Sequence, residues 1–154
     1  MGLSIAAADA AGPTLRCQWA VQGVVGPVGS VRLRLTLSNR GTRAIQVLEW
    51  ATPFEGWMSP WLEVRLNGQV LPYQGASVKR GDPAATEYLR LAPGRSRQAT
   101  VDLAEVYDLT RPGRYELRSA ITLHDVTTGN PPRPRERHVP LSLACTPLSF
   151  NRSG

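Results

Sequence analysis

The side chains best suited to catalysis are two histidines and two cysteines, and their spacing supports no reaction. A zinc hydrolase needs two or three closely spaced His or carboxylate ligands, whereas His124 and His138 belong to no His-Glu-x-x-His pattern. Nucleophilic catalysis needs a Ser or Cys beside a His and an orienting acid, but Cys17 and Cys145 fall inside strand-like runs and no Gly-x-Ser-x-Gly turn occurs. No glycine-rich phosphate loop precedes a helix. The sequence therefore predicts a protein that is not an enzyme and holds no cofactor or metal.

Four aromatic residues around two prolines are better placed to bind a partner than to react. Trp50, Phe54, Trp57 and Trp61 fall within twelve residues. Trp50 ends a strand-like run and is expected in the core. Exposed aromatic side chains on a rigid loop make good interface anchors, so Phe54, Trp57 and Trp61 are candidate partner-binding residues. The alternative is that the loop folds back and buries them as a satellite cluster, and the sequence leaves both open.

The positive charge alone would allow nucleic acid as the partner, but the spacing of the arginines argues against it. The net charge is +6 over 154 residues, and Lys79 is the only lysine. Arginines such as Arg32 and Arg34 alternate with apolar residues, and others occupy turns, which is typical of solvated sheet faces rather than of a nucleic-acid-binding motif. No apolar run approaches the ~20 residues that a membrane-spanning helix needs.

The N-terminal residues and the cysteines both point to an exported protein. Residues 1–12 predict a flexible tail or the remnant of a signal peptide, because Ala8-Asp9-Ala10 resembles a small-x-small cleavage site. A disulfide between Cys17 and Cys145 would close a loop of over a hundred residues, worth ~4–5 kcal/mol in the chain-entropy model, and would suit an oxidising compartment. Two buried free thiols are the alternative.

The pattern of apolar residues is that of β-strands throughout. Val31–Leu37 alternates strictly, and Asn67-Gly68 is a strong hairpin signal. Tyr115, after a glycine turn and at the start of a long strand, suits a tyrosine corner. These features predict an all-β, immunoglobulin-like antiparallel β-sandwich of about eight strands, forming one domain over 13–148 with a tail at 149–154. The expected strands include 15–21, 31–37, 44–50, 61–66, 69–73, 88–91, 99–103, 114–123 and 139–145.

The order of rare residues through the middle of the chain carries a family resemblance. The matching pieces are Leu35-Thr36-Leu37-Ser38-Asn39-x-Gly41, Val47-Leu48-x-Trp50-x-Thr52-Pro53-x-Glu55-Gly56, Val64-x-x-Asn67-Gly68, Pro72-Tyr73-x-Gly75, Lys79-Arg80-Gly81-x-Pro83, Tyr88-x-x-Leu91-x-Pro93-Gly94, Val101-Asp102-Leu103-x-x-x-Tyr107-Asp108 and Gly113-x-Tyr115. Together they resemble the N-terminal pro-domain of the secreted deuterolysin-like and peptidyl-lysine metalloendopeptidases, the aspzincins. The His-Glu-x-x-His of their catalytic domain has no counterpart in these residues. The resemblance therefore implies a pro-domain-like module without the peptidase, which would inhibit a secreted zinc metallopeptidase or assist its folding.

Two docking hypotheses follow from the resemblance. In one, the loop from Thr52 to Pro60 enters the peptidase cleft, with Phe54 and Trp57 as anchors and Glu55 near the zinc. In the other, Lys79, flanked by Val78 and Arg80, is the bait for a lysine-specific cleft, with Arg80 as a further candidate partner-binding residue. The structural alternatives are a solvated turn at 79–81 and, for Glu55, a carboxylate that accepts backbone hydrogen bonds.

Other assignments of function stay open at this stage. An adhesion or scaffold sandwich would have the same fold, because fold alone does not specify function. The chain could also be the pro-segment of a longer precursor. The sequence allows either a monomer or a dimer formed through an edge strand.

Overall fold

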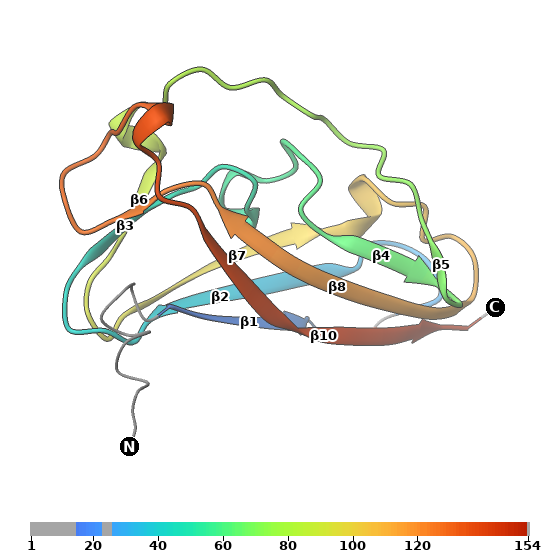
Figure 1. Cartoon of the computed structure of the whole chain (residues 1–154). Helices are drawn as coiled ribbons and strands as arrows, with labels where there is room; N and C mark the ends of the chain where they lie inside the picture. The colour runs from blue at the N-terminus through green and yellow to red at the C-terminus, as the bar shows by residue number, and fades with distance from the viewer. Residues whose placement is uncertain (1–14, 23–25, 154) are drawn as a thin grey trace.

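The computed structural model describes residues 15–22 and 26–153, and over these residues the protein is an antiparallel β-sandwich (Figure 1). It has ten strands and four short 3-10 helices. The predicted all-β, immunoglobulin-like class is confirmed. Within the described ranges, no helix is long and apolar enough to cross a membrane.

The strands form three hydrogen-bonded sheets. The first has the order β1-β2-β7, the second β10-β8-β4-β5 and the third β6-β3-β9. Their bounds are β1 Leu15–Val21, β2 Arg32–Asn39, β3 Ile45–Leu48, β4 Glu63–Leu66, β5 Gln69–Val70, β6 Tyr88–Leu91, β7 Ser96–Asp102, β8 Gly113–Leu123, β9 Val126–Thr127 and β10 Leu141–Arg152. The 3-10 helices are η1 Pro53–Glu55, η2 Ala85–Glu87, η3 Leu103–Glu105 and η4 Arg135–Arg137.

The hydrophobic core lies between the sheets because alternate residues of each strand point inward. On β2, Leu33, Leu35 and Leu37 are at most 2% exposed. One buried cluster joins Leu33 to residues of β4, β7, β8 and β10, and a second joins Leu35 and Leu37 to β1, β3, β6, β8 and β10. The inward face of β2 therefore supports both halves of the core.

Two local predictions are matched by the geometry. The Asn67-Gly68 turn connects β4 to β5 with positive φ angles of 48° and 87°, the backbone that a tight hairpin turn of this type needs. Tyr115 is fully buried, and its hydroxyl donates a hydrogen bond of 2.5 Å to the Arg111 carbonyl. This bond ties the start of β8 to the turn before it, as in a tyrosine corner.

The ends of the chain differ in part from expectation. The predicted tail at 149–154 is wrong for residues 149–152, which continue β10; Phe150 stacks on Tyr115 with ring centroids 5.1 Å apart. Cys17 and Cys145 form a disulfide that joins β1 to β10, with Cα atoms 5.0 Å apart. The predicted tail at 1–12 lies outside the described residues.

Candidate functional site

The chain between β5 and η2, residues 71–84, is a long extended connection that crosses one side of the sandwich, along the top of Figure 1. We call it the 71–84 connection. It has no strand partner, but three backbone bonds fasten it at intervals. The amides of Leu71, Gln74 and Val78 donate to the carbonyls of Val64 (2.8 Å), Val106 (2.8 Å) and Met58 (3.0 Å) respectively. Met58 lies in the segment 50–61 that holds the four clustered aromatic residues, which we call the aromatic loop. The connection therefore carries Lys79 across the surface at a defined position.

Two tryptophans of the aromatic loop fold back onto the sandwich. Trp57 stacks on Trp61 with centroids 4.4 Å apart and planes 4° apart, and Trp61 stacks on Trp19 of β1 at 5.6 Å. The Trp57 indole N–H donates to the Asp102 carbonyl at 3.1 Å. Trp61 is 7% exposed. The prediction that Trp61 is an exposed partner-binding anchor is therefore wrong, because its indole is buried in a stacked array of rings and does not reach solvent.

Phe54 and Glu55 lie in η1, which Thr52 caps by accepting a 3.2 Å hydrogen bond from the Phe54 amide. The Phe54 ring is partly buried against the second core cluster. Glu55 accepts from the Ala51 amide at 2.7 Å and pairs with Arg80 at 2.5 Å. The Glu55 side chain is only 12% exposed. The Glu55 carboxylate thus accepts a backbone hydrogen bond within its turn, as the alternative interpretation of the sequence expected, and also forms an ion pair with Arg80.

Arg80 fastens the 71–84 connection to η1, η2 and Trp50. Besides Glu55, its guanidinium lies 3.8 Å from Glu87 and 5.1 Å from the centre of the Trp50 ring, a cation–π arrangement. The Trp50 indole N–H donates to Glu87 at 2.8 Å. The rings of Trp50 and His124 pack edge to face, with their centroids 6.0 Å apart. Burial, followed by the neighbouring charges of His138 and Arg80, lowers the pKa of His124. These contacts give Arg80 a structural role, and the partner-binding role expected for it stays a prediction.

The loop between β9 and β10, residues 128–140, is hydrogen-bonded to Asp125 and to the Arg80 backbone. Asp125 is 0% exposed and accepts bonds from Tyr88 (2.7 Å), the Val139 amide (2.8 Å) and Arg133. Burial raises the pKa of Asp125, but these hydrogen bonds outweigh it and the net shift is downward. Arg135 donates to the Arg80 carbonyl at 2.8 Å. Arg133 is thus turned toward the buried Asp125.

An apolar and basic surface remains accessible beside these anchored groups. Lys79 is exposed, Val78 is 41% exposed and Met58 is 42% exposed. The bond from the Val78 amide to the Met58 carbonyl holds the two apolar residues together. We call these three residues the Met58–Lys79 surface. Sequence reasoning named Lys79 and its neighbour Val78 but not Met58, whose only signal is that it follows Trp57.

The described residues 15–22 and 26–153 contain no group of three or more His, Cys, Asp or Glu side chains that could hold a metal ion. The two histidines both flank Trp50, with ring centroids 6.0 and 5.9 Å from it. His138 Nε2 lies 2.9 Å from the Arg133 carbonyl.

Part of the chain is similar to segments of known proteases, one of which is named as extracellular. No family model matches the sequence. An extracellular protease of Aeromonas hydrophila is 33% identical over 95 residues, which cover 62% of this chain and 27% of that protein. A neutral protease 2 homolog of Uncinocarpus reesii is 27% identical over 95 residues, covering 60% and 27%, and one of Arthroderma gypseum is 26% identical over 97 residues, covering 62% and 26%. The match thus spans about a quarter of each relative's length.

Among solved structures, the CARDB domain of a Pyrococcus furiosus protein is similar over 86% of this chain and 94% of that domain, with a TM-score of 0.36 and 14% identity.

Proposed function

We propose that this chain is a non-catalytic, pro-domain-like module that binds a secreted zinc metallopeptidase and inhibits it or assists its folding. The observation that carries the proposal is the stretch of 95 residues shared with an extracellular protease at 33% identity, which makes up only 27% of that protein. In this proposal the shared segment is a module that accompanies a catalytic part in the relative and stands without it here. Export to the periplasm or the outside is part of the same proposal.

The Met58–Lys79 surface is the proposed docking site. It joins two exposed apolar side chains to the one lysine of the chain, and an apolar patch beside a single charge suits a specificity cleft that reads a lysine. The connection that carries it is pinned on both sides, at Gln74 by Val106 and at Arg80 by Glu55. Such anchoring lowers the ordering cost of binding. In this proposal Phe54, Glu55 and Trp57 do not enter the cleft, and Glu55 holds Arg80, the neighbour of Lys79, through their ion pair.

Inhibition of a purified aspzincin peptidase, titrated at fixed substrate, tests the proposal. The expected result is saturable inhibition at a one-to-one ratio. For a lysine-specific peptidase, Lys79→Arg should weaken inhibition about tenfold, a cost of about 1.4 kcal/mol. Undiminished activity with folded protein present in excess would contradict inhibition and leave folding assistance, which is scored by the yield of active peptidase refolded with and without the module.

A matched pair of variants locates the docking surface. The double variant Met58→Ala and Val78→Ala removes exposed apolar area from the proposed surface. Val139→Ala is the control, because Val139 is also exposed (57%) but lies outside that surface. The double variant should weaken inhibition and the Val139 variant should not. Equal effects would show that the Met58–Lys79 surface is not the contact.

A further inference from the structure

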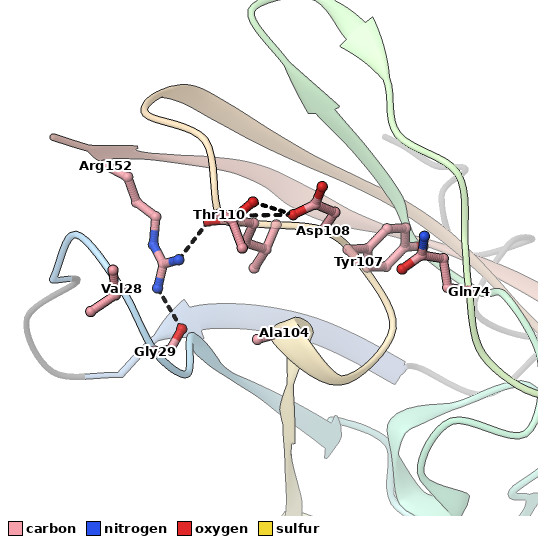
Figure 2. A pocket seen from close by; sticks show the side chains of 9 residues that line it. Val28, Gly29, Gln74, Ala104, Tyr107, Asp108, Thr110 and Arg152 are labelled. Atoms are coloured by element: carbon pink, nitrogen blue, oxygen red, sulfur yellow. Dashed lines mark hydrogen bonds between the residues drawn. The ribbon is translucent and has the colours of Figure 1, made fainter. Parts of the chain in front are cut away.

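A cavity of about 470 Å³ opens where the end of β10 meets two connections (Figure 2). Val28 and Gly29, which precede β2, form one wall. The chain between η3 and β8 supplies another, including Asp108 and Thr110, and Gln74 of the 71–84 connection lies at the rim. This cavity is separate from the Met58–Lys79 surface and plays no part in the proposed function.

The unusual group in the wall is the guanidinium of Arg152, which is 4% exposed. It donates to the Leu109 carbonyl and the Gly29 carbonyl, each at 2.6 Å. The Arg152 Nε has no hydrogen-bond partner among the described residues. No carboxylate of the described residues forms an ion pair with the Arg152 guanidinium. Two neutral carbonyls leave the positive charge uncompensated, and burying a charge in that state is costly.

The acid in the cavity is engaged elsewhere. Asp108 accepts from the Thr110 amide at 3.1 Å and from the Thr110 hydroxyl at 2.5 Å, and these bonds lower the pKa of Asp108. Figure 2 shows Thr110 between Asp108 and Arg152. The cavity therefore combines a buried cation with a fixed carboxylate that does not reach it.

We propose that this cavity binds a carboxylate at Arg152, supplied by a small free acid or by the terminus of a peptide. A guanidinium has five N–H donors in a fork that matches a carboxylate, and the two carbonyls occupy two of them. The cavity volume is in the range of small-ligand pockets. A singly charged carboxylate is favoured over a phosphate because the second negative charge of a phosphate would be repelled by Asp108.

Calorimetric titration of the full chain with three probes tests the assignment. N-acetylalanine carries a terminal carboxylate, N-acetylalaninamide is its uncharged counterpart, and acetate is a free acid. Amidation should weaken binding at least about tenfold. Tighter binding of N-acetylalanine than of acetate identifies a peptide terminus as the source, and equal binding identifies free acids. Binding of the amide as tight as that of the acid, or no binding of either acid at about 10 mM, overturns the proposal.

Variants separate the guanidinium from general charge effects. Arg152→Met should abolish acid binding, whereas Arg118→Met, which removes the same charge from a side chain 52% exposed on β8, should leave it unchanged. If Arg152→Met does not fold, Asp108→Asn decides, because asparagine keeps the turn to Thr110 while removing the repelling charge. That variant should bind N-acetylalanine about threefold tighter, and unchanged or weaker binding overturns the proposal.

Discussion

Removing the Cys17–Cys145 disulfide should cost this protein a large part of its stability. The bridge joins β1 to β10, the first and last strands of the sandwich, across a sequence separation of 128 residues. In the chain-entropy model, a closed loop of that length restricts the unfolded chain by about 5 kcal/mol at 25 °C. With an unfolding entropy of ~2.1 cal/mol/K per residue, this loss corresponds to a fall in Tm of about 15 °C.

Guanidinium unfolding followed by tryptophan fluorescence measures the loss. Both sulfur atoms are in buried residues, 9% and 2% exposed, so a Cys17→Ala and Cys145→Ala double variant loses packing as well as the cross-link. The reduced wild-type protein keeps both side chains and isolates the cross-link. A reduced protein within about 1 kcal/mol of the oxidised one would refute the reasoning, because it would mean that the unfolded chain gains no freedom when the bridge opens.

Two further predictions concern buried ionisable groups. Asp125→Asn should lower the free energy of unfolding by about 3 kcal/mol, since it leaves Arg133 without its charged partner. Burial opposes ionisation of Asp125, but its hydrogen bonds lower the pKa overall, so the stability it contributes is present above pH ~3.9 and lost as pH falls through the lower folded pKa; an acid titration as steep in the variant as in the wild type would contradict this. Burial raises the pKa of Tyr107 to about 12, so the folded state retains the proton and stability should fall between pH ~10 and ~12. Tyr107→Phe should reduce that alkaline slope while costing about 1 kcal/mol at neutral pH for the bond to Leu62; an unchanged slope would contradict the assignment.

Most of the fold could be predicted from local sequence patterns. The strict alternation of β2, the Asn67-Gly68 turn and the glycine before Tyr115 each act through neighbours in the chain, so period-two burial and turn chemistry identify them. The end of β10 was missed because Pro147 lacks an N–H donor and looks like a strand end. A register shift between Cys145 and Leu148 accommodates it, and the strand continues.

The candidate site was harder to predict from the sequence, because its contacts join segments that are far apart in the chain. Burial of Trp61 depends on stacking with Trp19 of β1, and Glu55 finds its cation 25 residues away at Arg80. No spacing rule connects such partners. Arg152 was missed for the same reason, since its carbonyl acceptors lie 43 and 123 residues away. Lys79 was found only because it is the single lysine of the chain.

The central claim is that the Met58–Lys79 surface binds a metallopeptidase, and direct calorimetric titration of a purified aspzincin with this protein tests it without depending on inhibition. The expected result is a one-to-one complex that weakens in the Met58→Ala and Val78→Ala double variant and persists in Val139→Ala. No heat of binding at two temperatures, with both proteins shown to be folded, would contradict the claim.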